Sequence, residues 1–93
     1  MSKVKIIFPA VFTKVTSGEK IVEVNASNLL EAINNLGEKY GPPFRNRVFE
    51  SPGKVRRLLN FYINGKNIQH MSGFETHLNE GDEVSILPAV SGG

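Results

Sequence analysis

The first quarter of the chain carries two stretches in which apolar and polar residues alternate. Residues 3–8 are rich in β-branched and aromatic side chains and end at Pro9, and residues 19–25 alternate in the same way. Both patterns predict β-strands. Residues 16–18, Thr-Ser-Gly, have the composition of a turn. The sequence therefore predicts an antiparallel pair of strands joined by a rather long loop.

A helical period follows over residues 27–40. Its apolar positions recur at offsets of three, four, seven and eleven and so share one face: Leu29, Ala32, Ile33, Leu36 and Tyr40. Ser27 or Asn28 can cap the first turn, and Asn28 with Glu31 has the spacing of a capping box. Gly-Pro-Pro at positions 41–43 predicts the end of this helix.

The second half of the chain is irregular at first and then returns to strands. Residues 44–49 allow a short helical turn, and residues 58–63 predict a strong strand. The Asn-Gly pair at 64–65 predicts a type I′ hairpin turn, with a short return strand over residues 66–70. Residues 83–87 predict the last strand.

The predicted order of elements is β-β-α-β-β-β. One amphipathic helix is enough to cover one face of a mixed sheet of four to five strands, which makes an α+β roll of two layers. A chain of 93 residues fits one domain. We expect this domain to span residues 1–88, followed by a flexible tail over residues 89–93.

Composition and charge exclude several classes of function. The absence of cysteine removes disulfides, thiolate catalysis and cysteine metal sites. No apolar run reaches the roughly 18 residues of a membrane span, and the N-terminus lacks the pattern of a signal peptide, so we expect a cytoplasmic protein. The net charge of +2 is modest. Lys54, Arg56 and Arg57 form a basic cluster without interleaved aromatic residues, which favours a solvated loop over a nucleic-acid site.

The terminal pair Gly92-Gly93 is the most informative chemical feature. The simplest explanation of the two glycines is a frayed terminus, because such termini are commonly rich in glycine and serine. However, the pair follows a well-defined strand through a short uncharged segment. Residues without side chains pass through a narrow channel and present their carboxylate to another protein's active site. Such a carboxylate has a pKa near 3.5 and is ionised at neutral pH.

Residues 80–93, read as EGDEVSILPAVSGG, resemble the C-terminal signature of the MoaD/ThiS sulfur-carrier family. The signature consists of a Gly-Asp turn, a β-branched strand, a proline, a small apolar pair and a terminal Gly-Gly. The helix after the second strand and the Asn-Gly hairpin also match. Residues 51–54, Ser-Pro-Gly-Lys, and the strand after them are most similar to the thiocarboxylate carrier of a cysteine pathway, followed by the molybdopterin-synthase small subunit and the archaeal ubiquitin-like modifiers.

The resemblance implies a β-grasp, or ubiquitin-like, fold and a carrier that is not itself an enzyme. It implies that an E1-like enzyme uses ATP to adenylate Gly93, that a sulfur donor then forms a thiocarboxylate, and that no cofactor is bound. Implied acceptors are a cysteine synthase-like enzyme or the large subunit of molybdopterin synthase, without nucleic acid or membrane. The following residues would give Gly93 its reach: Pro88, Ala89, Val90, Ser91 and Gly92.

Family members dock through an exposed apolar patch on the sheet. By alignment, Phe8 and Leu87 occupy two positions of this patch, and polar Asn67 occupies a third, which departs from the molybdopterin-synthase pattern. Ordinary core packing is an equal alternative for Phe8 and Leu87. His70 and His77 lack the cysteine or carboxylate partners of a metal site, so we expect no bound metal.

Three functions stay open on these grounds. The first is a sulfur carrier, and the second is a protein modifier joined through Gly93 to lysines of target proteins. Both require the same tail and the same kind of activating enzyme. The third is a β-grasp binding module whose terminal glycines are incidental.

Overall fold

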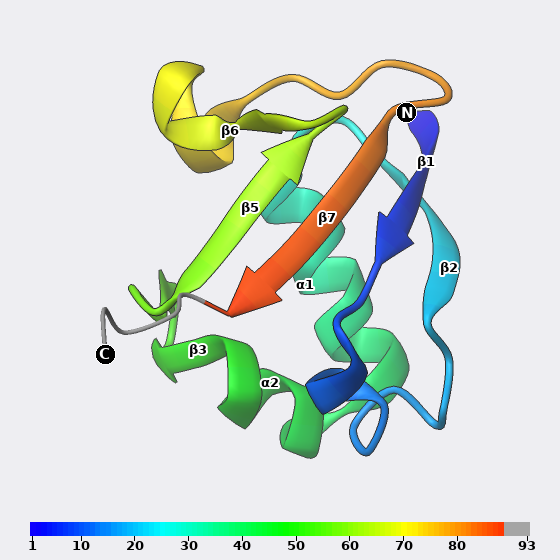
Figure 1. Ribbon diagram of the computed structural model, residues 1–93, viewed down its shortest axis with the longest axis vertical. Coiled ribbons are helices and arrows are strands. Elements are labelled where there is room, and N and C mark those ends of the chain that lie inside the picture. The colour runs from blue at the N-terminus through cyan, green and yellow to red at the C-terminus, as the bar shows by residue number, and fades with distance from the viewer. Residues whose placement is uncertain (89–93) are drawn as a thin grey trace.

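One mixed sheet with the strand order β2-β1-β7-β5-β6 dominates the computed structural model, which describes residues 1–88 (Figure 1). Its strands are β1 (Ser2–Ile7), β2 (Ile21–Ala26), β5 (Leu59–Ile63), β6 (Lys66–Asn67) and β7 (Glu83–Pro88). β1 is antiparallel to β2 and parallel to β7, while β5 is antiparallel to both β7 and β6. The predicted α+β fold, with a mixed sheet of four to five strands and one main helix, is confirmed, and the sheet has five strands.

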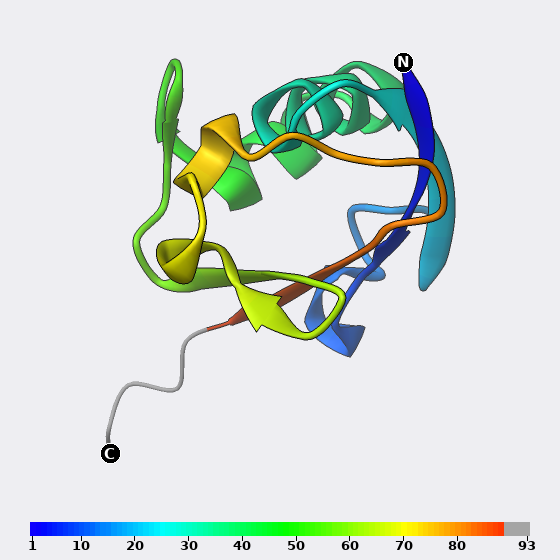
Figure 2. The same ribbon diagram turned by 90° about the horizontal axis from the view of Figure 1, so that it is seen from above.

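Helix α1 (Leu29–Tyr40) lies across the concave face of the curved sheet (Figure 2). Its N-terminus has the predicted capping box. Asn28 Oδ1 accepts a hydrogen bond from the Glu31 N–H at 2.8 Å, and the Glu31 carboxylate accepts one from the Ser27 N–H at 2.7 Å. Because both side chains satisfy backbone donors that the helix leaves free, the start of α1 is fixed at this point.

The core lies between α1 and the inward face of the sheet. Alternate strand residues are buried there, in agreement with the period of two in the sequence. The sheet contributes Val4, Ile6, Val22, Phe61, Ile63, Val84 and Ile86, and the helix contributes Leu29, Ala32, Ile33 and Leu36. The opposite face of the sheet carries no helix (Figure 2).

Residues 41–55 contain more structure than the sequence analysis predicted. Helix α2 (Pro42–Val48) begins directly after Gly41, and a two-stranded hairpin follows with β3 (Phe49–Ser51) and β4 (Lys54–Val55). The two prolines end α1 as expected, but they also form the first turn of α2, where a missing N–H costs nothing. Gly41 permits the sharp change of direction with a φ of 82°.

The return strand predicted over residues 66–70 is shorter in the structure. β6 ends at Asn67, and Ile68–His70 form a turn of 3-10 helix, η2. The Asn67 side-chain oxygen accepts a hydrogen bond from the Gln69 N–H at 2.8 Å. This local cap competes with continued pairing and ends the strand. A second 3-10 turn, η3 (Gly73–Glu75), precedes the connection to β7.

Candidate functional site

The end of β7, at Pro88, is the last described point of the chain, and the C-terminal residues 89–93 are joined to it. β7 is the central strand of the sheet, with β1 on one side and β5 on the other. Its pairing with β5 continues to its last residue, where Pro88 lies opposite Leu59. Pro88, which was expected both to end the domain and to help give Gly93 its reach, is the last residue of this strand. A proline is accommodated at a strand end because only one ladder donor is lost there.

The beginning of β7 is held by the hairpin between β5 and β6. The Glu83 N–H donates to Asn64 Oδ1 at 2.9 Å, and Asn64 Nδ2 donates to Asp82 Oδ1 at 2.9 Å. Asn64 and Gly65 have φ values of 51° and 86°, as the predicted Asn-Gly turn requires. The turn thus presents the Asn64 side chain toward β7, so the hairpin and the central strand are joined by side-chain as well as backbone bonds.

A second set of bonds joins the turn before β7 to β1. The Lys3 N–H donates to the Glu80 carboxylate at 2.8 Å, and the Gly81 N–H donates to the Lys3 carbonyl at 2.9 Å. The Lys5 N–H donates to the Asp82 carbonyl at 2.9 Å. These bonds fix the beginning of β7 against β1, and the pairing with β5 continues to Pro88, the residue to which the C-terminal residues are joined.

Gly93, the predicted modification site, lies outside the described residues, as do Ala89, Val90, Ser91 and Gly92. Covalent geometry nevertheless limits their reach. Five residues beyond Pro88 span at most about 18 Å when fully extended. Any protein that acts on the carboxylate of Gly93 must therefore approach the end of β7 closely.

The predicted partner surface needs one correction. Phe8 is only 5% exposed, and its ring packs against Phe12, Tyr40 and Phe44 at centroid distances of 6.0–6.2 Å. Phe8 thus belongs to the core, which was the alternative interpretation. Leu87, in contrast, is 46% exposed. The alternation Val4, Ile6, Phe8 already places Phe8 on the inward face.

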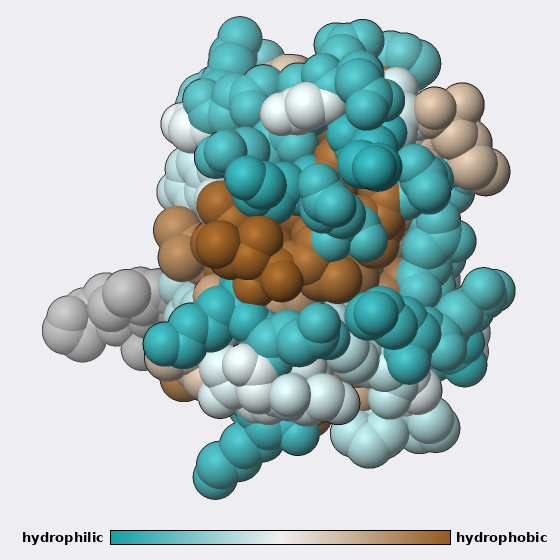
Figure 3. Space-filling model, turned by 90° about the vertical axis from the view of Figure 1, so that its right-hand side faces the viewer, coloured by the Kyte–Doolittle hydropathy of each residue, from teal (hydrophilic) through white to brown (hydrophobic). Residues whose placement is uncertain are grey.

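The outward neighbour of Phe8 is Ile7, which the sequence analysis missed. Ile7 pairs with Ile21 on β2 and with Ser85 on β7, and Ile21 is 55% exposed. Leu87 follows Ser85 on the same face of β7. Figure 3 shows a compact hydrophobic area on the side of the molecule that includes β2, bordered by hydrophilic side chains. The helix-free face of the sheet therefore offers apolar side chains near the end of β7.

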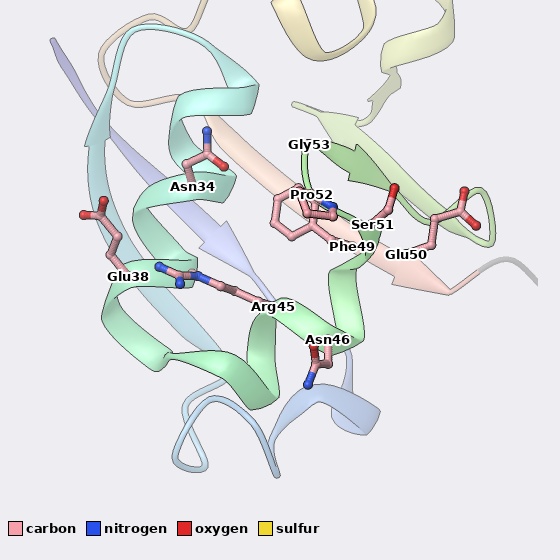
Figure 4. A pocket seen from close by; sticks show the side chains of 10 residues that line it. Asn34, Glu38, Arg45, Asn46, Phe49, Glu50, Ser51, Pro52 and Gly53 are labelled. Atoms are coloured by element: carbon pink, nitrogen blue, oxygen red, sulfur yellow. The ribbon is translucent and has the colours of Figure 1, made fainter.

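A hollow with a volume of about 650 Å³ lies between α1, α2 and the β3–β4 hairpin. Arg45 of α2 extends along α1 toward Glu38, and Phe49 and Pro52 form the wall on the hairpin side (Figure 4). The polar side chains that line the hollow are exposed. Ser51 and the carboxylates of Glu38 and Glu50 line the hollow, but Glu50 pairs with Lys54 at 3.3 Å, and among the described residues no hydrogen bond joins the Ser51 hydroxyl to a carboxylate. The hollow therefore has no activated nucleophile.

The titratable groups of residues 1–88 form no further chemical site. Three or more potential metal ligands gather nowhere among the residues that the structure describes. Burial, together with a 2.6 Å hydrogen bond from its hydroxyl to the Glu19 carboxylate, raises the pKa of Tyr40. Tyr40 therefore stays protonated and serves as a structural donor. No helix in the described region is long and apolar enough to cross a membrane.

Comparison with known proteins shows which family this chain belongs to. The model of the ThiS family matches residues 6–93, which include the whole of β7 and the terminal glycines. The chain belongs to the ThiS family. The resemblance seen in the C-terminal signature is thereby confirmed, and so is the assignment of the chain as a sulfur carrier protein of the ThiS type rather than an enzyme.

Individual ThiS-like relatives cover nearly the whole chain. The sulfur carrier protein CysO of Mycobacterium tuberculosis is 35% identical over 91 residues, which are 97% of this chain and 98% of CysO. The solution structure of small archaeal modifier protein 1 from Methanosarcina acetivorans superposes with a TM-score of 0.88 at 31% identity, covering 100% of this chain and 98% of that one.

A third relative was solved together with another protein. The CysO chain in the BexX/CysO complex of Amycolatopsis orientalis has a TM-score of 0.84 at 31% identity, with 97% of this chain and 99% of that chain covered. The matched proteins thus include both carriers and a modifier. The ThiS fold alone does not separate these two uses of the tail.

Proposed function

We propose that this protein carries sulfur as a thiocarboxylate on Gly93. The carboxylate of Gly93 attacks the α-phosphorus of ATP in an E1-like enzyme, pyrophosphate leaves, and an acyl adenylate forms. Sulfide then attacks the carbonyl carbon, the bond to AMP breaks, and a thiocarboxylate remains. The adenylate step is needed because an ionised carboxylate is not electrophilic.

The observation that supports this proposal most directly is the position of β7. A central strand, bonded on both sides and anchored at its start, is followed by five uncharged residues that end in two glycines. The domain thereby holds the origin of the tail rigid, while Gly92 and Gly93 carry no side chain to obstruct a channel. The chain contains no cysteine, so its sulfur chemistry requires a group such as the Gly93 carboxylate.

The proposal names two protein partners. The first is the adenylating enzyme, which binds the ATP that the reaction uses. The carrier itself holds no cofactor. The second is a sulfur-accepting synthase, either cysteine synthase-like or similar to the large subunit of molybdopterin synthase. We place both encounters in the cytoplasm, where ATP is available. For the acceptor, the outward side chains Ile7, Ile21 and Leu87 offer an apolar docking area beside the tail.

The test is the intact mass of the protein after incubation with its cognate adenylating enzyme, ATP and sulfide. We expect a gain equal to one exchange of oxygen for sulfur, localised to Gly93 by fragmentation. A reaction without ATP and a chain that lacks Gly92 and Gly93 serve as controls and should keep their mass. An unchanged mass in the presence of an enzyme that adenylates another carrier would refute the proposal.

A second use of the same tail is supported by the similarity to small archaeal modifier protein 1. In this use, a lysine amine of a target protein attacks the acyl adenylate and forms an isopeptide bond with Gly93. Conjugates in cell extract, visible as a ladder with an antibody to the chain, would favour this function. Sulfide-dependent product formation without a ladder would favour the carrier.

A further inference from the structure

Basic side chains concentrate at the end of the molecule from which the tail emerges. We call this end the exit pole. It comprises the segment between β1 and β2, the C-terminal end of α1, α2, the β3–β4 hairpin and the residues that lead into β5 (Figure 1). Eight of the eleven basic residues lie there: Lys14, Lys20, Lys39, Arg45, Arg47, Lys54, Arg56 and Arg57.

Acidic residues show the opposite distribution. The exit pole holds three of the nine, Glu19, Glu38 and Glu50, so its net charge is +5. The remainder of the chain has a net charge of −3 and includes the acidic turn before β7. The overall charge of +2 therefore conceals a strongly polarised molecule, and the positive end is the one that carries the tail.

The fold brings these residues together from separate parts of the sequence. β1 and β7 are parallel and end at the same pole, and β5 begins there because it is antiparallel to β7. Arg56 links the loop before β5 to α2. Its backbone N–H donates to the Val48 carbonyl at 2.8 Å, and its guanidinium donates twice to the Asn46 carbonyl at 3.0 and 3.2 Å. Arg57 is thus held close to the arginines of α2.

Exposed apolar side chains lie in the exit pole and in the neighbouring last residues of β7. Leu58 is 67% exposed and Leu87 is 46% exposed. Arg45, Arg47 and Arg57 are exposed as well. The salt bridge between Lys54 and Glu50, 3.3 Å long, is the only one within the described residues, so the other seven basic side chains of the pole have no carboxylate partner there. Leu58 directly follows Arg56 and Arg57, and an exposed apolar side chain next to arginines combines two features of the cores of protein interfaces.

We propose that the exit pole docks on an acidic surface of the adenylating enzyme, around the entrance through which Gly93 reaches the nucleotide. This inference rests on the proposed function. The tail spans at most about 18 Å, so an enzyme that binds Gly93 must also lie against the surface around Pro88. A protein surface fits better than a nucleic acid, because Phe12 and Phe44 at this pole are buried, and Tyr40 and Phe49 are partly buried against the core, so none of them offers a free ring face on which bases could stack.

The test compares two pairs of charge reversals that alter the net charge equally. The test pair is Arg47→Glu with Arg57→Glu, and the control pair at the other end of the molecule is Lys3→Glu with Lys66→Glu. Pyrophosphate release by the cognate adenylating enzyme is measured against carrier concentration at low and high salt. We expect the test pair to lower kcat/KM by about tenfold at low salt, with kcat within about twofold of wild type, because rim charges act on association.

High salt should shrink this loss to less than about threefold, since exposed charges are screened. The neutral pair Arg47→Gln with Arg57→Gln should give a smaller loss of the same kind, and circular dichroism establishes that each variant is folded. Equal losses in the test and control pairs, an unchanged kcat/KM, or a loss in kcat alone would overturn the inference. So would weakened binding of single-stranded RNA with unchanged enzyme kinetics. Failure of the wild-type chain to react at all would instead count against the proposed function.

Discussion

At the scale of single residues, neighbouring side chains at the end of β1 have opposite roles. Phe8 is enclosed by three aromatic rings, two of them edge-on at interplanar angles of 74° and 76°. Ile7 lies on the other face of the sheet beside Ile21. Because successive strand residues point to opposite faces, a shift of one position separates a core residue from a docking residue.

This separation predicts different costs for two truncations. Phe8→Ala removes a buried ring and leaves a cavity, so we expect the free energy of unfolding to fall by about 3–5 kcal/mol. Leu87→Ala removes a half-exposed side chain and should cost about 1 kcal/mol or less. Urea unfolding followed by circular dichroism measures both. Similar costs for the two variants would contradict the assignment of Phe8 to the core and Leu87 to the surface.

The position of Phe8 was predictable from the sequence, and that of Asn67 was not. The alternation Val4, Ile6, Phe8 predicts that the Phe8 side chain points into the core, whereas the alignment with the family placed Phe8 in the exposed patch. Asn67 sits where a strand ends because its side chain caps the following turn at Gln69. The sequence alone allows that side chain to bond locally or to continue the strand, and only the tertiary context decides between them.

At the scale of elements, the capping box of α1 makes a measurable contribution. Asn28 and Glu31 satisfy two backbone donors at the start of the helix. We expect Asn28→Ala to lower the free energy of unfolding by about 1 kcal/mol. Asn34→Ala makes the same chemical change at an exposed position within α1 and should be neutral or slightly stabilising.

Thermal and urea unfolding of the two asparagine variants provide the comparison. Equal effects at positions 28 and 34 would mean that the substitution acts through helix propensity rather than through the cap. If Asn28→Ala lowers the free energy of unfolding in the wild type but not in a variant that already lacks Glu31, the two capping side chains act as one unit.

The elements with a clear local sequence signal were the easiest to predict. The amphipathic period of α1 and the Asn-Gly turn follow from local patterns, and the structure has both. Helix α2 was underestimated because Gly41, Pro42 and Pro43 indicate termination, although prolines also begin helices. The β3–β4 hairpin was missed because its strands contain three and two residues, too few to show a period.

At the scale of the whole molecule, the decisive contact joins strands from the two ends of the chain. β1 and β7 pair in parallel although Lys5 and Glu83 are far apart in sequence. Local patterns identify each strand but carry no information about this partner, so the strand order came from the structure. The charge polarity of the exit pole depends on the same pairing and was equally hidden in the sequence, where Lys54, Arg56 and Arg57 indicated only a solvated loop.

A truncation tests whether fold and function are separable at this scale. The five strands of the sheet and the buried apolar cluster described above lie within residues 1–88. Removal of Gly92 and Gly93 should therefore change the free energy of unfolding by less than about 0.5 kcal/mol. The same variant should lose all activity as a carrier. Retained sulfur transfer in a biosynthetic assay would exclude both the carrier and the modifier functions of Gly93.

The parallel pairing of β1 with β7 also determines how the molecule bears a mechanical load. A partner that pulls on the tail pulls along the axis of β7, while the N-terminus leaves from the opposite end of β1 (Figure 1). Tension between the termini therefore shears the ladder, so that its hydrogen bonds share the force instead of opening one after another. The proposed function has partner enzymes bind the C-terminus in their active sites, and this shear geometry resists unravelling of the fold from that end.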